Sequence, residues 1–336
     1  MADFLFRADA SPRMGIGHVM RCLAIAEGLA DRGHRCHFAC AELTEAAARR
    51  LDKEGITRHV LDGEAAFAVL VRALDPAALI LDGYHLTPAF RREAASLGRP
   101  VLTFQDHADA TPLHAGLIVN PPGNGADPAG RAAAPDALWI CGREAILLRR
   151  ELRTALALAM LPIEARPSIL VSFGGTDPAG LTLPVAAALT RRLGPVKLEV
   201  VIGGGLVGAK ALVGEIDALG SHISVHLDPF ELGPLMRRSG LAVSAAGGTV
   251  GELAGLGVPS VIAVIAENQR LGAAAAAADG WCRAVDPDAA ALAEAAATLW
   301  RDPAGRAEMA IRARGLVDGR GVERVVEALL GICTKV

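Results

Sequence analysis

Short apolar segments alternate with amphipathic segments along nearly the whole chain, and this alternation is the feature that most constrains the fold. The first apolar segment, Phe4–Ala8, precedes a stretch over 18–32 in which apolar residues recur at three- and four-residue spacing. Gly33 is placed to end this helix, and a second apolar segment, Arg35–Cys40, follows it. Strands separated by helices in this way form parallel sheets with helices on both faces. The sequence therefore predicts an α/β fold.

The alternation is interrupted at two places, which predicts a division into two doubly wound, Rossmann-like domains. Residues 121–135 are rich in Pro, Gly and Ala without periodicity, and the stretch LPIEARP has the composition of a linker. A second alternating series starts at Ser168. Two such domains are expected to face each other across a cleft that takes the ligand at the carboxyl ends of the strands. The expected organisation is an N-terminal domain over 1–160, a linker over 161–167, a C-terminal domain over 168–310, and C-terminal helices over 311–336 that pack back on the N-terminal domain.

Composition excludes several classes of function. The chain has 336 residues, enough for two domains, and a formal net charge of −3 at pH 7, which argues against nucleic acid or an anionic membrane surface as a partner. We find no uncharged apolar run of the roughly 18–20 residues that cross a bilayer, so no membrane insertion is expected. The N-terminus, MADFLFRAD, carries charge within its short apolar run, unlike a signal peptide. The expected location is the cytoplasm.

The six cysteines include no CxxC pair, so reduced thiols are expected. His34, Cys36, His37 and Cys40 lie close together in the sequence and have ligand chemistry suited to zinc. They fall on the predicted strand Arg35–Cys40, however, where successive side chains point to opposite faces. We therefore expect neither a metal nor another cofactor.

Two glycine-rich turns follow predicted strands in the second half of the chain. They are SFGGTD, over 172–177, and SAAGGT, over 244–249. Each places free backbone N–H groups before a helix, which suits phosphate oxygens, and two together suggest a diphosphate. Glycine turns are nevertheless common in any α/β sheet. Glu252 lies three residues after Thr249 and is suited either to a ribose diol or to a capping box with Thr249.

The stretch RMGIGHVMRC, over 13–22, follows the first strand and resembles a dinucleotide-binding glycine loop. The third glycine position of that fingerprint is Met20, which is too large for close packing of helix and strand, so the fingerprint fails. His18 then lies in the first turn of a helix, whose positive end disfavours the imidazolium form. A neutral imidazole there accepts a proton as a general base. The alternative is a polar residue at a helix start, hydrogen-bonded to a loop.

Further polar residues at or near the predicted strand ends are candidates to line a sugar. For Asp9 an Asx turn or a helix cap is an equal explanation, and Tyr84, the only tyrosine, is as well explained by packing under a loop. Asp106 and His107 have the chemistry of a proton relay, but their pairing is not readable from the sequence. The candidates are Asp9, Asp82, Tyr84, Asp106, His107, Glu267, Asn268 and Gln269.

Several motifs together resemble the bacterial UDP-sugar hydrolases of pseudaminic acid biosynthesis, which are relatives of the MurG glycosyltransferase and have the GT-B fold. The similarity runs through nearly the whole chain in the family's order. The first motif is specific, whereas the glycine motifs are shared by many GT-B proteins. The motifs are FRADASPRMGIGHVMRCLAIAEGL (6–29), LDGYHL (81–86), LLRREL (147–152), SFGGTD (172–177), SAAGGTVGEL (244–253) and ENQ (267–269).

The resemblance implies a role for each matching residue. His18 matches the catalytic base, Glu252 the residue that holds the ribose, and Phe230 lies at the loop where uracil docks. Sugar-side positions are Asp9, Gly17, Asp82, Tyr84, Glu267, Asn268 and Gln269, and diphosphate positions are Gly174, Gly175, Thr176, Asp177, Gly247, Gly248 and Thr249. The family often has two adjacent acidic residues where this chain has Asp106 and His107.

The implied activity is hydrolysis of UDP-2,4-diacetamido-2,4,6-trideoxy-β-L-altropyranose to UDP and free sugar, with inverting attack of water at C1. The small-molecule UDP-sugar is then the only partner, and a monomer is expected. Two alternatives stay open at this point: a MurG-like glycosyltransferase that uses a nucleotide-sugar donor, and a nucleotide-sugar binding module without catalysis. A nicotinamide oxidoreductase is disfavoured by the failed glycine fingerprint.

Overall fold

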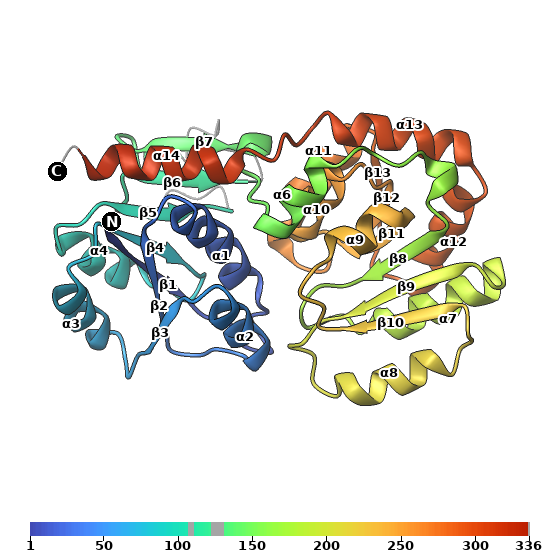
Figure 1. The fold of residues 1–336 in the computed structure, drawn as a ribbon, viewed down its shortest axis with the longest axis horizontal. Coiled ribbons are helices and arrows are strands. Elements are labelled where there is room, and N and C mark those ends of the chain that lie inside the picture. The colour runs from blue at the N-terminus through green and yellow to red at the C-terminus, as the bar shows by residue number, and fades with distance from the viewer. Residues whose placement is uncertain (107–110, 122–130, 335–336) are drawn as a thin grey trace. The chain divides into compact units, whose positions relative to one another are not determined.

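The computed structural model describes residues 1–106, 111–121 and 131–334 of the chain (Figure 1). The chain forms two compact units, one of Met1–Arg150 with Arg320–Val336 and the other of Glu151–Gly319. We call them unit 1 and unit 2. Each is built on a parallel sheet, of seven strands in unit 1 and six in unit 2. The predicted α/β class with two Rossmann-like units is thereby confirmed.

The sheet of unit 1 has the strand order β3-β2-β1-β4-β5-β6-β7. The order reverses between β1 and β4, which makes this the topological switch point of the unit. The strands are β1 (Asp3–Ala8), β2 (Arg35–Cys40), β3 (Thr57–Val60), β4 (Ala78–Asp82), β5 (Val101–Phe104), β6 (Leu117–Asn120) and β7 (Leu138–Cys141). The helices are α1 (Gly17–Ala30), α2 (Glu45–Lys53), α3 (Ala65–Leu74), α4 (Pro88–Ser96) and α14 (Gly321–Cys333), with a 3-10 turn η2 (Gly142–Ala145).

The last helix of the chain completes the core of unit 1. Val322 and Val325 of α14 are buried in the same apolar cluster as Phe4 of β1 and Leu29 of α1. A Cβ atom added at Gly28 would lie 2.5 Å from a methyl group of Val322, so the glycine allows α1 and α14 to approach closely. Helix α14 thus belongs to unit 1.

The sheet of unit 2 has the order β10-β9-β8-β11-β12-β13, with its switch point between β8 and β11. The strands are β8 (Ser168–Ser172), β9 (Lys197–Ile202), β10 (Ile223–Leu227), β11 (Ser239–Ala245), β12 (Ser260–Ala263) and β13 (Cys282–Val285). The helices and 3-10 turns are α6 (Arg150–Ala157), η3 (Ile163–Ala165), α7 (Thr182–Leu193), α8 (Ala209–Asp217), α9 (Gly233–Arg238), α10 (Thr249–Gly255), η4 (Glu267–Gln269), α11 (Arg270–Ala278), α12 (Ala289–Trp300) and α13 (Pro303–Arg314).

The boundaries of the two units differ from the expected ones at 160 and 311. The break after Arg150 has a local cause: the Arg150 guanidinium donates to Asp31 of unit 1 at 2.8 Å, whereas the Glu151 carboxylate accepts the N–H of Gly233 in unit 2 at 3.0 Å. Helix α13 also belongs to unit 2, so the chain returns to unit 1 only at Arg320. The predicted linker over 161–167 lies within unit 2 and contains η3.

Two helices start later in the chain than the periodicity-based expectation. The helix expected from Glu42 begins at Glu45, since Thr44 accepts the N–H of Ala47. The helix expected from Pro178 begins at Thr182. The short edge strands β7 and β13 were not predicted. None of the helices in the described part of the chain has the length and apolar character needed to cross a membrane.

Candidate active site

The carboxyl ends of β1 and β4 bring the predicted catalytic histidine to the switch point of unit 1. Ala8 and Asp82 are register partners at the ends of these two strands. His18 lies in the first turn of α1, the helix that follows β1. Ligands of open α/β sheets bind at such a point, so the position of His18 is one where chemistry is expected.

His18 is held there by Asp82, which is almost fully buried. His18 Nδ1 lies 2.8 Å from Asp82 Oδ1, and the Asp82 side chain is 1% exposed. Burial alone would raise the pKa of the Asp82 carboxyl, but the Arg21 guanidinium and His18 together hold it below its ordinary value. The Nη2 atom of Arg21 also lies 3.3 Å from Nδ1. An ionised carboxylate only accepts hydrogen bonds, so Nδ1 donates to Asp82, and the lone pair of a neutral ring is then on Nε2. Such a ring is arranged to take up a proton at Nε2.

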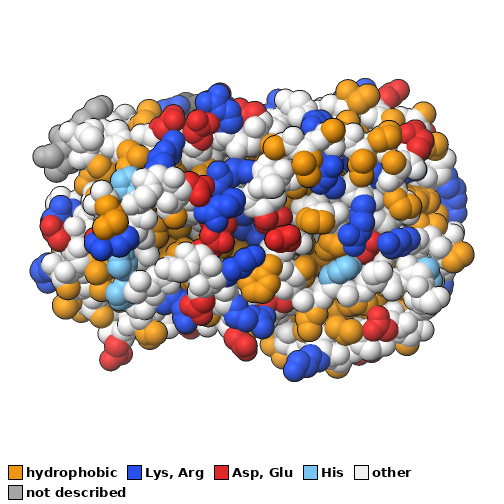
Figure 2. All heavy atoms as spheres, in the orientation of Figure 1, with side chains coloured by type: hydrophobic (Ala, Val, Ile, Leu, Met, Phe, Trp, Pro, Cys, Tyr) orange, Lys and Arg blue, Asp and Glu red, His pale blue; other side chains and the backbone are white. Residues whose placement is uncertain are grey.

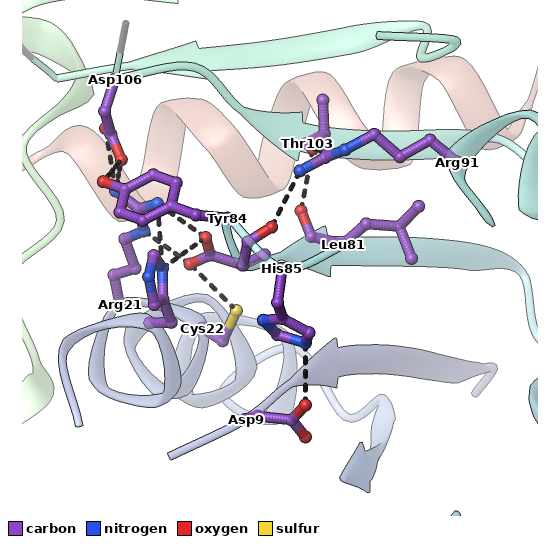
Figure 3. A network of polar contacts seen from close by, with 12 residues as sticks. Asp9, Arg21, Cys22, Leu81, Tyr84, His85, Arg91, Thr103 and Asp106 are labelled. Atoms are coloured by element: carbon purple, nitrogen blue, oxygen red, sulfur yellow. Dashed lines mark hydrogen bonds and ion pairs between the residues drawn. The ribbon is translucent and has the colours of Figure 1, made fainter. Parts of the chain in front are cut away.

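The Arg21 side chain joins two carboxylates beside His18 and was not singled out from the sequence. Its Nε and Nη2 donate to Asp82 at 2.5 and 2.6 Å, and its Nη1 donates to Asp106 at 3.0 Å. Burial favours the neutral form, but the charges of Asp82 and Asp106 raise the pKa of Arg21 above its ordinary value. Its guanidinium also lies 4.1 Å from the ring centroid of Phe104, at the end of β5. Arg21 is therefore a fixed positive charge between two fixed negative ones (Figure 3).

Tyr84 completes this network from the loop after β4. Its hydroxyl donates to Asp106 Oδ2 at 2.6 Å, and its ring packs edge-on against the His18 ring with centroids 4.7 Å apart (Figure 3). The residue is 52% exposed, which leaves part of the ring open to a ligand. His107, the expected relay partner of Asp106, lies outside the described residues.

Asp9, expected on the sugar side, is surrounded by protein donors. Its carboxylate accepts from Arg7 at 2.6 Å and from the N–H of Ala41 at 2.7 Å. It also accepts from His85 Nε2 at 2.8 Å (Figure 3). Burial opposes ionisation, but the contacts with His85 and Arg7 hold the pKa of Asp9 below its usual range. Asp9 therefore ties together the ends of β1, β2 and β4. Gly17, the other residue expected on the sugar side in this region, has no atom within 4 Å of the position that a Cβ would take.

The first glycine loop of unit 2 follows β8, at the switch point of that sheet. Gly174 has φ of +80°, which favours glycine, and a Cβ added at Gly203 would lie 2.4 Å from the Gly175 Cα. The loop after β9 therefore packs directly on this turn. Asp177 accepts the N–H of Leu181 at 3.0 Å and also binds Thr182, so its carboxylate satisfies backbone donors at the start of α7. Thr176 lies between Gly175 and Asp177 in the same turn.

The second glycine loop, with Gly247 and Gly248, follows β11 on the other side of the switch point. Gly248 precedes α10, which starts at Thr249, so Glu252 is the fourth helical residue. Gln269 Oε1 accepts the N–H of Ile265 at 2.9 Å.

The remaining predicted site residues of unit 2 lie at two different strand ends. Phe230 follows β10 and is 38% exposed. Glu267 forms an exposed ion pair with Arg270 at 3.0 Å, and Asn268 lies beside it in η4.

Figure 2 shows Lys, Arg, Asp and Glu side chains spread over the face in view, with both charge signs interspersed.

Comparison with family models finds no match. An uncharacterized protein, MJ1062, of Methanocaldococcus jannaschii is 22% identical over 269 residues, which are 78% of this chain and 55% of the relative. The chain thus spans about half the length of the curated relative it matches. At this identity the relative shows no family.

Solved structures share the fold over nearly the full length of the chain. MurG of Acinetobacter baumannii has a TM-score of 0.64 at 19% identity, with 98% of this chain and 100% of MurG covered. MnaA of S. aureus, solved with UDP, has a TM-score of 0.67 at 11% identity, with 100% and 98% covered. HepE of Anabaena, solved with UDP-glucose, has a TM-score of 0.64 at 16% identity, with 100% of each chain covered. The chain therefore has the GT-B fold of MurG and related enzymes, with two parallel-sheet α/β units.

Proposed function

We propose that this chain binds a UDP-sugar and breaks the bond between sugar C1 and the diphosphate oxygen, with His18 as general base. The observation that carries the proposal is the 2.8 Å contact between His18 and the buried Asp82 carboxylate at the switch point of unit 1. Further support comes from the shared fold, since the MnaA and HepE structures contain UDP and UDP-glucose.

In the proposed step, His18 Nε2 accepts a proton from the attacking water as the water oxygen bonds to C1. The C1–O bond to the diphosphate breaks at the opposite face of C1, and its electron pair leaves with UDP. The configuration at C1 is therefore inverted. Asp82 stabilises the imidazolium that forms, and the step balances without oxidant or reductant.

The proposal assigns nucleotide binding to unit 2. Backbone N–H groups of the loops at Gly174–Gly175 and Gly247–Gly248 are the proposed donors to the diphosphate, because small residues let phosphate oxygens approach the backbone closely. Glu252 is proposed to bind the ribose diol, and Phe230 to lie at the uracil. Since the Asp177 carboxylate binds backbone donors at the start of α7, we assign its part in the loop to the backbone rather than the side chain.

The finer proposal is a hydrolase that acts on a UDP-2,4-diacetamido sugar, as the motif resemblance implies. The second candidate is a glycosyltransferase in which an acceptor hydroxyl takes the place of water. MurG has the same fold over the whole chain length, and the same histidine serves either nucleophile. The two activities differ only in what attacks C1.

Incubation of the protein with UDP-2,4-diacetamido sugars in ¹⁸O-labelled water, without an acceptor, tests the proposal. Hydrolysis predicts equal amounts of UDP and free sugar, with the label on sugar C1 and inverted configuration by NMR. A transferase predicts little release until an acceptor sugar or lipid is added. Label in UDP would mean attack at phosphorus and would overturn the role given to His18.

A further inference from the structure

Two carboxylates and one guanidinium lie beside His18 and together carry a net negative charge. Asp82 contacts the ring at 2.8 Å, Arg21 contacts Asp82 and also lies 3.3 Å from His18 Nδ1, and Asp106 contacts the far side of Arg21 at 2.9 Å. The Arg21 side chain is 20% exposed and that of Asp106 is 7% exposed, so water screens these charges weakly. Counted with both carboxylates ionised, the three groups sum to one negative charge.

We propose that Arg21 and Asp106 are positioning residues that set how readily His18 releases its proton, a role that rests on the proposed function. With Arg21 absent, two unneutralised carboxylates would hold the ring as imidazolium, a form without a free lone pair for the nucleophile. With Asp106 absent, Arg21 would neutralise Asp82 and the ring would bind protons less strongly.

The other titratable groups around the His18 ring do not change the net charge of Asp82, Arg21 and Asp106. Cys22, on the same helix, donates its thiol to Asp82 at 3.8 Å, and burial raises the pKa of that thiol, so it stays neutral. Tyr84 faces the ring as a phenol that donates to Asp106. At the end of β1, Asp9 is paired with Arg7 and His85.

The geometry also predicts what each group does to the orientation of the ring. Arg21 makes two hydrogen bonds to Asp82 and thereby holds the oxygen that binds His18 Nδ1. Tyr84 and Arg21 share Asp106, which stops the guanidinium from rotating away. Arg21 is three residues after His18, so both side chains lie on one face of α1.

The test is an NMR titration of the His18 ring, with its signal identified by loss in His18→Gln. Arg21→Met is expected to raise the pH at which the ring titrates by about 1–3 units, the usual effect of a charge within hydrogen-bonding reach. Asp106→Asn is expected to lower it. The double variant Arg21→Met with Asp106→Asn restores the original sum of charges and should titrate between the two single variants.

Arg32→Met is the matched control, because Arg32 lies just beyond the end of α1 and pairs with Glu327 at an exposed site. It should leave the titration unchanged. An upward shift in Arg21→Met together with a downward shift in Asp106→Asn supports the proposal, and any other combination of shifts overturns it. If Arg21→Met fails to fold, the direction of the Asp106→Asn shift decides alone.

A second measurement separates this inference from the proposed function. The acid limb of kcat/KM for UDP-sugar cleavage should move in the same directions as the ring titration, and Arg21→Lys should restore most of it. If the two variants show the predicted NMR shifts but the protein cleaves no UDP-sugar, the proposed function is contradicted and the inference about Arg21 and Asp106 stands. If the protein cleaves UDP-sugar but the acid limb of kcat/KM does not move in Asp106→Asn, the inference about Arg21 and Asp106 is contradicted and the proposed function stands.

Discussion

At His18 two electrostatic influences oppose one another. The amino end of α1 carries partial positive charge and disfavours the imidazolium form, whereas the Asp82 carboxylate 2.8 Å away favours it. Only the first influence was expected from the sequence.

His18→Gln keeps a similar shape and removes the base. We expect the rate of UDP-sugar cleavage to fall about 10²–10⁴-fold, the usual contribution of a general base. UDP binding, measured by calorimetry, should be unchanged because the proposed nucleotide loops belong to unit 2. Near-normal turnover in this variant would remove His18 from the mechanism.

Glu199 shows how one buried carboxylate joins several elements of unit 2. It lies on β9 and binds His226 of β10 at 2.7 Å, Arg238 at the end of α9 at 2.8 Å, and Lys197 at 3.1 Å. Burial would raise the pKa of Glu199, but these three partners lower it to about 2. The edge strand β10 is thereby fastened to the sheet.

Because the pKa of Glu199 is lower in the folded chain than the ordinary value of 4.5, its ionised form stabilises the fold above pH 4.5. This contribution is lost as the pH falls from 4.5 towards 2. Glu199→Gln should lower the free energy of unfolding by about 1–3 kcal/mol at pH 7. The difference from the unsubstituted chain, measured by urea unfolding, should shrink over that range of pH; a difference that grows on acidification would contradict the assignment.

The loop after β9 is predicted to support the first glycine loop. Gly203→Ala would place a Cβ 2.4 Å from the Gly175 Cα, so the Gly174–Gly175 turn must move. We expect UDP binding by calorimetry to weaken by about tenfold or more, equivalent to about 1.4 kcal/mol. Gly214→Ala in α8, where nothing lies within 4 Å of the new Cβ, is the control and should bind UDP normally.

On the scale of the whole molecule, the chain ends inside the unit where it began. Four apolar side chains of α14 are buried in the core of unit 1: Val322, Val325, Val326 and Leu329. Unit 2 consists of the single stretch Glu151–Gly319. The stability of unit 1 therefore depends on the last helix, whereas the core of unit 2 does not contain it.

Truncation after Gly319 tests this dependence. Each buried apolar side chain of α14 contributes about 1.5–3 kcal/mol, so their loss is comparable with the whole stability of a domain. Hydrogen exchange should show lost protection over residues 1–150 and retained protection over 151–319. Equal loss in both units would show that they unfold together.

The candidate site was only partly predictable from the sequence. His18 was recognised because it opens a helix directly after a strand, and the glycine loops because small residues follow β8 and β11. The pairing of His18 with Asp82 was missed, since 64 residues separate them. Arg21 was missed although its spacing of three from His18 was a usable signal. The position of the Asp177 carboxylate beside the first backbone N–H groups of α7 was missed, because that helix starts four residues later than periodicity suggested.

Local pattern alone determined the α/β class, most strands, and the position of His18 at the start of α1, because these features depend on neighbours within a few residues. Tertiary structure decided which of the polar residues at strand ends meet. The strand order places β4 beside β1 and β5 beside β4, so Asp82, Tyr84 and Asp106 converge on one helix face. It also decided that the chain returns to unit 1 only at Arg320, after α13, because the contacts that hold α14 in the core of unit 1 join residues separated by nearly the whole chain.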